Sequence, residues 1–214
     1  MKSILIIGLG RFGRHMSKKL IEQGNSVLAI DSSEVRADNA VDILPDIQIG
    51  DSTNESFIRS LGVNNFDLCV VAIGDNFQAA LETTVLLKDY GANYILARAC
   101  KQIHKKLLLR NGADHVVYAE REVAERLAIR YGSRNLFDYI ELSPEYAIYE
   151  IAVPDNWVGK TIAEKGIRAK FNINILATKK DKKIDPNPSP DHVFDANETL
   201  MILAEHNVAK NFIK

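Results

Sequence analysis

The glycine spacing near the N-terminus constrains the fold of this chain more than any other feature. Gly8, Gly10 and Gly13 form a G-x-G-x-x-G sequence directly after a short apolar run at residues 3–7. In such a sequence the first glycine suits a tight turn, the second lets backbone N–H groups approach a pyrophosphate, and the third allows a helix to pack closely on a strand. A glycine turn without a ligand is the alternative interpretation. The context favours the first βαβ unit of a nucleotide-binding domain.

Two further side chains fit this interpretation. Asp31 ends the second apolar run, 18 residues after Gly13. A carboxylate there can accept hydrogen bonds from both ribose hydroxyls and repels a 2′-phosphate, so NADP is disfavoured. Arg11 lies inside the glycine loop, where a guanidinium can lie over the phosphates, although an exposed arginine at a helix start is also common.

Short β-branched runs alternate with amphipathic stretches up to about residue 118. The apolar runs lack strict alternation, which is typical of parallel strands buried on both faces. Several helical stretches end at a glycine, a common helix stop. These features predict an α/β fold with a Rossmann doubly wound parallel sheet. The expected strands are residues 3–7, 26–30, 47–49, 68–73, 94–97 and 115–118, and the expected helices are residues 11–23, 34–40, 55–61, 77–89 and 101–111.

The pattern changes after Pro144. A helix is expected at residues 120–131, and it leads toward residues 134–142. Beyond them we expect strands at residues 147–153, 173–178 and 199–204, and a polar, proline-rich loop at residues 179–190. This part is interpreted as a small C-terminal α+β domain, too small to bury a large core alone and therefore dimeric. The predicted domains are residues 1–135 and 136–214.

Composition narrows the classes of function. Lys+Arg (27) and Asp+Glu (28) nearly cancel and aromatics make up 7%, which argues against nucleic acid as the ligand. The N-terminal segment does not resemble a signal peptide and no apolar run could span a bilayer, so a soluble, cytoplasmic protein is expected. Cys69 and Cys100 are interpreted as buried thiols, with a redox switch as the alternative. The histidines show no metal-ligand spacing.

Polar residues also follow the later strands, on the side where a doubly wound sheet binds ligands. Residues 50–53 (Gly-Asp-Ser-Thr) suit the edge of an adenine, although Asp51 or Ser52 could equally cap a helix. Residues 73–75 should form the floor of the crevice at the switch point. Arg98 and Cys100 follow the fifth strand on the same side.

Several segments together resemble the regulator-of-potassium-conductance (RCK, or KTN) domains of bacterial Ktr/Trk potassium uptake systems. They are IIGLGRFG (residues 6–13), IGDST (49–53), VAIG (71–74), GADHVV (112–117), DYIELS (138–143), IRAKF (167–171) and NPSP (187–190). The resemblance covers essentially the whole chain. It implies a non-catalytic cytosolic gating subunit, peripheral to the inner face of the cell membrane, with a crossover helix between its domains. It also implies a homodimer, an octameric ring and an integral-membrane potassium-translocating partner.

The resemblance implies ligands as well. ATP or ADP, or NAD(H), would compete for the crevice, and ATP would promote the open state. Arg11 would meet the γ-phosphate, and Glu120 would help to hold a divalent or monovalent cation at the dimer interface. By position, the nucleotide-binding residues would be Gly8, Gly10, Arg11, Phe12, Gly13, Asp31, Ser32, Ser33, Asp51, Ser52, Ile73, Gly74, Asp75, Arg98, Ala99, Cys100, His104 and Glu120.

In related C-terminal lobes cyclic di-AMP binds across the dimer interface and favours the inactive state. The matching positions are Ile162, Ile167, Arg168, Ala169, Asn174 and Pro188. Arg168 would contact phosphate and the aliphatic residues would sandwich adenine, although Ile167 and Ala169 are equally plausible in a core and Arg168 at the surface. The chain departs from the family at Gly166, which replaces a bulkier or acidic residue, and at Asn172, where the family usually has glycine. Asparagine is second only to glycine in tolerating the left-handed conformation, so we expect the turn at Asn172 to be kept.

Two other functions use the same features. An NAD-dependent oxidoreductase would need the same glycines and Asp31, but no Tyr-x-x-x-Lys sequence occurs and no His–carboxylate pair is placed by motif near the crevice. A redox-sensing DNA-binding repressor would need a helix-turn-helix or winged helix, which is not recognisable here, and the neutral charge balance counts against it.

Overall fold

The computed structural model describes residues 1–213, which form two compact units. The first unit is Met1–Arg121, and the second begins at Glu122. The predicted boundary after residue 135 placed the connecting helix α6 (Ala119–Gly132) in the first domain, whereas the compact units divide within this helix. No described helix combines the length and the apolar character that crossing a membrane requires.

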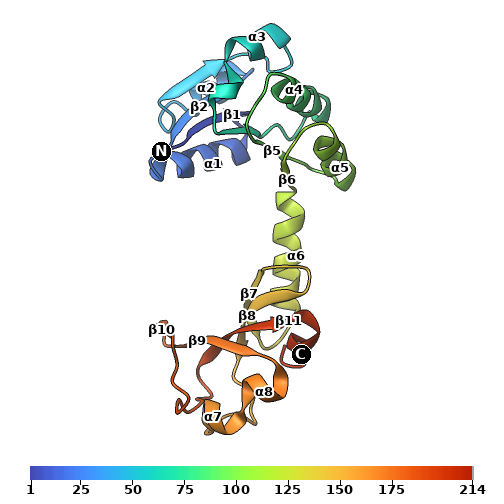
Figure 1. Cartoon of the computed structure of the whole chain (residues 1–214). Coiled ribbons are helices and arrows are strands. Elements are labelled where there is room, and N and C mark those ends of the chain that lie inside the picture. Colours follow the sequence, from blue (N-terminus) through green and yellow to red (C-terminus); the bar gives the residue numbers. More distant parts are fainter. Residues whose placement is uncertain (214) are drawn as a thin grey trace. The chain divides into compact units, whose positions relative to one another are not determined.

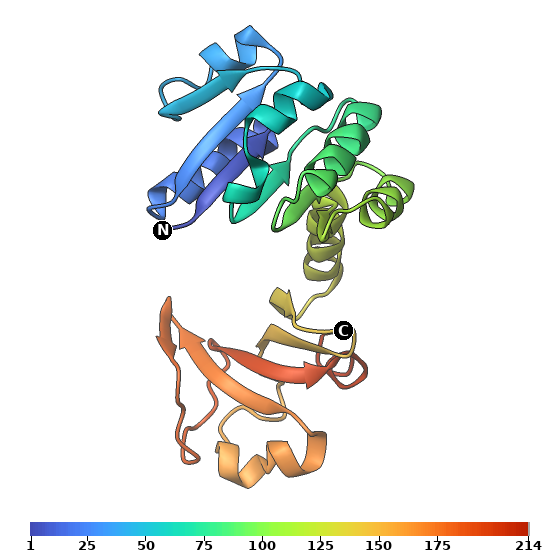
Figure 2. The same ribbon diagram turned by 45° about the horizontal axis from the view of Figure 1, so that its top comes forward.

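The first unit is built on a six-stranded parallel sheet in the order β3-β2-β1-β4-β5-β6 (Figures 1 and 2). This confirms the predicted Rossmann class. The strands are β1 (Ser3–Ile7), β2 (Ser26–Asp31), β3 (Asp46–Ile49), β4 (Leu68–Val71), β5 (Ile95–Arg98) and β6 (His115–Val117). The helices are α1 (Arg11–Glu22), α2 (Glu34–Asp38), α3 (Glu55–Ser60), α4 (Phe77–Asp89) and α5 (Gln102–Arg110), with a 3-10 turn at Val63–Asn65.

Side chains alternate across this sheet and fill a core on each face. On β1, Leu5 and Ile7 pack with residues of α3, α4 and α5, whereas Ile4 and Ile6 pack with the apolar side of α1. Figures 1 and 2 show α1 and α4 on opposite faces of the sheet. Because β1 lies between β2 and β4, the chain leaves the sheet in opposite directions on either side of β1. A crevice forms at the carboxyl ends of strands at such a switch point.

The second unit contains a five-stranded antiparallel sheet in the order β10-β9-β11-β8-β7. Its strands are β7 (Leu136–Glu141), β8 (Tyr146–Ala152), β9 (Asn174–Lys180), β10 (Lys183–Asp185) and β11 (Thr199–Glu205). Its short helices are α7 (Ile162–Lys165), α8 (Ile167–Phe171) and α9 (His206–Ala209). Trp157, the single tryptophan, is 1% exposed and packs against Phe171, Phe194 and Phe212.

The predicted polar loop at residues 179–190 is wrong in its first part, because β9 continues to Lys180 and pairs with β10. Asp181 and Lys182 form the turn with φ of 50° and 66°. Two consecutive positive φ angles match the right-handed twist of a two-residue hairpin. Every residue of β10 is exposed, so this strand carries no apolar alternation that could have predicted it.

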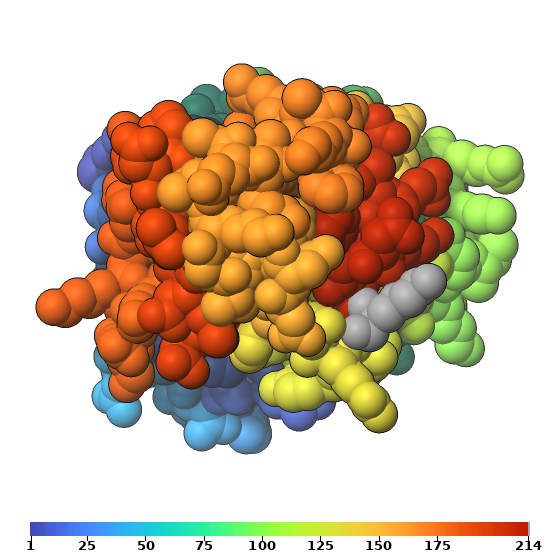
Figure 3. All heavy atoms as spheres, turned by 90° about the horizontal axis from the view of Figure 1, so that it is seen from below, coloured from blue at the N-terminus to red at the C-terminus, as the bar shows by residue number. Residues whose placement is uncertain are grey.

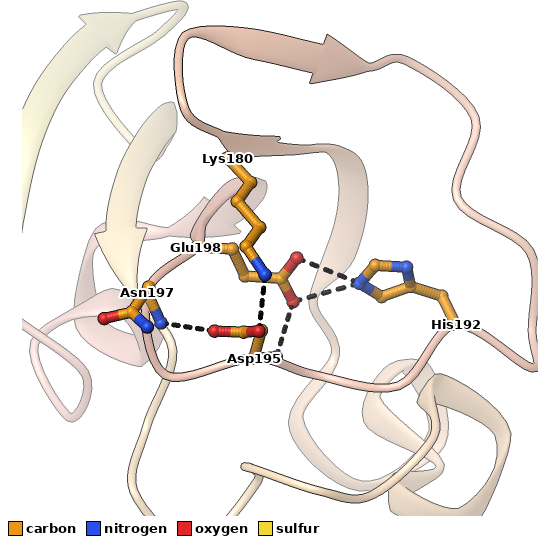
Figure 4. A network of polar contacts seen from close by, with 5 residues as sticks. All are labelled: Lys180, His192, Asp195, Asn197 and Glu198. Carbon is orange, nitrogen blue, oxygen red and sulfur yellow. Dashed lines mark hydrogen bonds and ion pairs between the residues drawn. The ribbon is translucent and has the colours of Figure 1, made fainter.

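A buried carboxylate organises the segment that follows this hairpin (Figure 4). Glu198 is 4% exposed and accepts hydrogen bonds from the backbone N–H of Asp195, at 3.1 Å, and from the ring Nε2 of His192, at 2.9 Å. The Asp195 carboxylate in turn accepts from the ammonium of Lys180, at 2.6 Å, and from the backbone N–H of Asn197. These contacts order a chain segment that has no regular secondary structure.

Candidate functional site: a nucleotide crevice

A pocket of about 820 Å³ lies at the carboxyl ends of the central strands of the first unit. Ligand pockets typically measure about 300–1,000 Å³. Most of the predicted nucleotide-binding residues line this pocket: Gly8, Gly10, Arg11, Phe12, Asp31, Ser32, Asp51, Ser52, Ile73, Gly74, Asp75, Arg98 and Glu120. Sequence reasoning missed Arg36 and Asn76 in the wall. Both lie near the start of a helix, and no sequence motif marks them. Their position in the pocket wall follows from how these helices pack on the sheet.

The three glycines of the first turn have different structural reasons. Gly8 has a φ of 104°, and a side chain on it would lie 3.1 Å from the backbone of Ala72. A side chain on Gly13 would lie 1.9 Å from the carbonyl oxygen of Gly8, so α1 can approach the turn only without one. A methyl group on Gly10 would meet nothing within 4 Å. The backbone at Gly10 is therefore open to a ligand.

The N-terminus of α1 has backbone donors without a side-chain acceptor. Its N-cap, Gly10, makes no capping bond, and its first turn contains no acidic residue. The neighbouring helices α2, α3 and α4 are capped by the side chains of Ser33, Asn54 and Asn76. Uncapped N–H groups and the helix dipole attract an anion. Among these helices, α1 is therefore the one prepared for a phosphate.

Asp31 holds the glycine turn in place. Its side chain is nearly buried, and its two oxygens accept the backbone N–H of Leu9, at 2.7 Å, and of Ser33, at 2.9 Å. Each carboxylate oxygen can accept a second hydrogen bond, so capacity for ribose hydroxyls remains. The guanidinium of Arg36 lies 3.8 Å from Asp31 and 3.7 Å from Asp75, and it balances the charge of both carboxylates across the pocket.

The structure of the loop after β3 shows that the interpretation of Asp51 or Ser52 as a helix cap is wrong. Neither residue caps α3, because the cap is Asn54, whose side chain accepts the N–H of Phe57. The Asp51 carboxylate instead accepts the N–H and the hydroxyl of Thr53. The hydroxyl of Ser52 is hydrogen-bonded to the hydroxyl of Thr83, 2.8 Å away, which holds its side chain toward α4.

An ion pair that packs on an aromatic ring lines another part of the pocket. The guanidinium of Arg98 donates to the carboxylate of Glu120 and lies over the ring of Phe12, 5.6 Å from its centroid. The pKa of Glu120 is held below its ordinary value, mainly by a backbone hydrogen bond and further by Arg98 and Arg11. Glu120 is therefore a carboxylate whose charge is already paired within the chain.

Five predicted residues do not line the pocket. Gly13 packs on the turn, Ser33 caps α2 and Ala99 is 1% exposed in the core. The thiol of Cys100 lies 3.3 Å from the carbonyl oxygen of Gly74. The ring of His104 stacks on Phe77 with 3.8 Å between centroids, and this contact directs it to α4.

A cation at Glu120 would need ligands from outside this chain. Within residues 1–213 no group of three or more His, Cys, Asp and Glu side chains could hold a metal ion. Glu120 alone, already bonded to Arg98, does not make a site. Phosphate oxygens or a second copy of the chain would have to complete it.

The predicted cyclic di-AMP residues of the second unit have mixed surroundings. Ile167 is 2% exposed and belongs to the core, so its side chain does not sandwich an adenine in this structure. Arg168 and Ala169 are exposed, and the Arg168 guanidinium donates to the side-chain oxygen of Asn174 at 2.9 Å. Ile162 and Pro188 are partly exposed. Figure 3 shows the segment containing α7 and α8 (orange) on the drawn face of the molecule.

The left-handed turn expected at Asn172 is present. Its φ is 54°, and it ends α8. Gly166, the other departure from the family pattern, has a φ of 56° and separates α7 from α8. Both departures are therefore compatible with the backbone that this lobe requires.

A parallel sheet with an open glycine turn, followed by a small antiparallel domain, defines a two-domain protein with an N-terminal Rossmann fold. The TrkA-N domain model matches residues 4–119, and the TrkA-C domain model matches residues 147–214. Ktr system potassium uptake protein C of Bacillus subtilis is 39% identical over 213 residues, which cover 100% of this chain and 96% of that protein. Ktr system potassium uptake protein A of the same bacterium is 34% identical over 211 residues, 99% of this chain and 95% of that protein.

The chain therefore belongs to the family of Ktr and Trk potassium uptake proteins built from TrkA-N and TrkA-C domains, and the resemblance seen in the sequence is confirmed. Among solved structures, the GsuK channel bound to NAD matches with a TM-score of 0.70 and 20% identity. The match covers 97% of this chain and 38% of the GsuK chain, so this chain spans less than half of that protein. At this identity the match supports the fold.

Proposed function

We propose that the chain is a non-catalytic, cytoplasmic regulatory subunit that binds an adenine nucleotide and gates a membrane potassium-translocating partner. One observation carries the proposal: the uncapped start of α1 lies over an open glycine, beside Arg11, in a chain 39% identical to a Ktr protein. The relatives' names refer to potassium uptake, and the chain supplies no described helix suited to crossing a membrane. The translocating part then belongs to an integral-membrane partner, and this chain would bind that partner at the inner face of the membrane.

The pocket suits ATP, ADP or NAD(H). The N–H groups of α1 and the guanidinium of Arg11 would hold the phosphates, and Asp31 would hold the ribose. The loop at residues 50–53 would meet the base. Structures of GsuK bound to NAD and bound to ADP support an adenine nucleotide as the class of ligand.

The third phosphate of ATP gives the pocket a way to distinguish it from ADP. It adds negative charge near Arg11, on the side where Arg98 and Glu120 are paired. A ligand shifts a conformational equilibrium only through contacts that differ between the two states. ATP would therefore activate, and ADP or NAD(H) would compete without making this contact.

A second copy of the chain would complete the assembly. No residue of α6 is buried, and Val123, Leu127 and Tyr131 are 48%, 40% and 76% exposed at helical spacing. Such a stripe favours burial against another surface. A homodimer through α6, assembling further to an octameric ring, would bring two Glu120 carboxylates and two γ-phosphates toward one axis, where a divalent or monovalent cation could offset their charge.

The second unit is proposed to bind cyclic di-AMP as an inhibitor. The exposed Arg168, held by Asn174, would meet a phosphate, with Ile162, Ala169 and Pro188 near the base. The buried Ile167 would support this surface from below without touching the ligand.

Calorimetric titration of the full chain with ATP, ADP and NADH tests the proposal. Arg11→Ala should lower the affinity for ATP by about ten-fold or more, because a charge-assisted contact to the third phosphate is lost. The affinities for ATP and ADP should then become similar. Arg59→Ala, an exposed arginine of α3 outside the pocket, is the matched control. If the wild type binds none of the three nucleotides, the proposal fails. If Arg11→Ala keeps the preference for ATP, Arg11 is not the sensor. A parallel titration with cyclic di-AMP tests the second unit.

A further inference from the structure

Two hydroxyl side chains that are 31 positions apart in the sequence meet inside the first unit. Ser52 lies in the loop between β3 and α3, and Thr83 lies on α4. Their hydroxyl oxygens are 2.8 Å apart, and the Thr83 hydroxyl is also 3.3 Å from the carbonyl oxygen of Ser52. Thr83 is 0% exposed and Ser52 is 6% exposed. This is therefore a buried polar link between a helix and a loop of the pocket.

Both distances are satisfied when the Thr83 hydroxyl donates to the Ser52 carbonyl and the Ser52 hydroxyl donates to the Thr83 oxygen. In this arrangement, removing the Thr83 hydroxyl leaves the buried hydroxyl and carbonyl of Ser52 without this partner, which is costly. Removing the Ser52 hydroxyl leaves the bond from Thr83 to the Ser52 carbonyl in place. The link constrains both the side chain and the backbone of Ser52.

The loop that this link holds is the wall of the pocket at the expected base end. Gly50 donates its N–H to the carbonyl oxygen of Asp31, and the Asp51 carboxylate binds Thr53 within the loop. Gly50, Asp51 and Ser52 all line the pocket. With the Ser52 hydroxyl engaged by Thr83, Ser52 presents its backbone to a ligand.

Thr83 also ties this loop to a second wall. Asn76 and Ala79, at the start of α4, line the same pocket. The helix is fixed there by the Asn76 side chain, which accepts the N–H of Ala79 at 3.1 Å. The link between Thr83 and Ser52 therefore sets the distance between the base-end loop and the loop after β4.

We infer that Thr83 is a positioning residue for base recognition, one that touches no ligand itself and sets the backbone of residues 50–53 against the adenine. This inference rests on the proposed nucleotide function. A recognition group must be held close to its productive geometry by neighbours that are themselves fixed, and a buried reciprocal hydrogen bond supplies this. Selectivity for adenine over guanine is the property that Thr83 would control.

The neighbouring Thr84 provides a matched control. It is also 0% exposed and on α4, but its hydroxyl donates to the carbonyl oxygen of Ala80, 2.7 Å away within the same helix. Thr83→Val and Thr84→Val remove the same atoms from the same buried helix. Only the first breaks a contact with the pocket loop.

The experiment measures the affinities of the full chain for ATP and GTP by calorimetry in the wild type, Thr83→Val, Thr83→Ser and Thr84→Val. Thr83→Val should lower the affinity for ATP by about ten-fold, the equivalent of one hydrogen bond, and change the affinity for GTP little. The ratio of the ATP affinity to the GTP affinity (the ATP:GTP ratio) should therefore fall. Thr83→Ser and Thr84→Val should keep the wild-type ratio. Ser52→Ala removes the bond between the two hydroxyls but keeps the bond from Thr83 to the Ser52 carbonyl, so it should lower the ratio by less than Thr83→Val does, and it tests the link even if Thr83→Val does not fold.

The outcomes separate this inference from the proposed function. An unchanged ATP:GTP ratio in folded Thr83→Val or Ser52→Ala overturns the role of Thr83 and leaves nucleotide binding standing. An equal fall in Thr84→Val also overturns it, because the effect would then come from the stability of α4. A wild type that binds neither nucleotide removes the proposed function and this inference together.

Discussion

At the scale of single residues, Gly10 and Gly13 of the glycine turn have different structural roles. Gly13 is required by contact, because a side chain there would collide with the carbonyl of Gly8. Gly10 is surrounded by open space and adopts an extended conformation that any residue can take. Folding and ligand access are thus separated between two glycines three positions apart.

This separation predicts opposite behaviour for two alanine variants. Gly13→Ala should destabilise the first unit by about 1–3 kcal/mol, the usual cost of overpacking, because backbone must move. Gly10→Ala should leave the stability within about 0.5 kcal/mol, as at an unconstrained site, yet weaken nucleotide binding because the methyl group occupies the open space. Chemical denaturation followed by circular dichroism, together with nucleotide titration, measures both. Equal stability of the two variants would contradict the assignment.

The residues that sequence could place are those fixed by a backbone pattern. Gly8, Gly10 and Arg11 belong to one continuous turn and Asp31 ends the next strand of the same βαβ unit, so their spacing predicted their position in the pocket. The link between Ser52 and Thr83 and the stacking of His104 on Phe77 join side chains from separate elements. Such pairs depend on how the elements pack, which spacing along the chain does not contain.

At the scale of elements, the short helix α7 depends on its cap. Thr161 accepts the N–H of Glu164 at 3.1 Å, and the Glu164 carboxylate accepts the N–H of Thr161 at 2.7 Å. This reciprocal capping box satisfies two N–H groups that the helix leaves free. The pKa of Glu164 is lowered as a result, mainly by the backbone N–H of Thr161.

Thr161→Ala should therefore destabilise the second unit by about 1 kcal/mol, the usual cost of losing an N-cap. Thr161→Ser keeps the hydroxyl and should remain close to the wild type. Urea unfolding followed by the fluorescence of Trp157 reports this unit, because Trp157 lies in its core. A variant with serine that is as unstable as the one with alanine would show that the methyl group, not the cap, matters.

Elements that carry a clear apolar pattern were predictable, and the short helices of the second unit were not. The predicted ranges 3–7 and 77–89 coincide with β1 and α4, whose apolar residues face a core. The helices α7, α8 and α9 span only four or five residues, too few to establish a helical period. Their existence follows from caps and from left-handed residues such as Gly166, which are visible once the fold is known.

At the scale of the whole molecule, buried acids that stay neutral limit stability at high pH. Burial raises the pKa of Tyr139 to about 12, with Glu141 adding to the effect, and burial raises the pKa of the Cys69 thiol to about 12. In the unfolded chain a tyrosine ionises near pH 10. The stability that Tyr139 contributes is therefore fully present below about pH 10 and is lost as pH rises toward 12, because the unfolded state releases its proton first. For the Cys69 thiol, whose ordinary pKa is 9.0, the loss begins nearer pH 9.

Tyr139→Phe should remove part of this loss. The free energy of unfolding of the second unit should fall less steeply in the variant between about pH 10 and 12, by roughly 2 kcal/mol over the interval. Urea titrations monitored through Trp157 at several alkaline pH values give the two slopes. Parallel curves for wild type and variant would show that Tyr139 does not carry the alkaline dependence.

The exposed helix α6 has a consequence for how the chain exists in solution. Its 14 residues bury no side chain, and an isolated helix of this length is only marginally formed in water. The helix is then stabilised by packing of its apolar stripe against another surface, which in the proposed homodimer is a second copy of the chain. If dilution dissociates the proposed homodimer, α6 should unfold before either unit does. The helical ellipticity measured by circular dichroism would then depend on protein concentration and report the association of the chains.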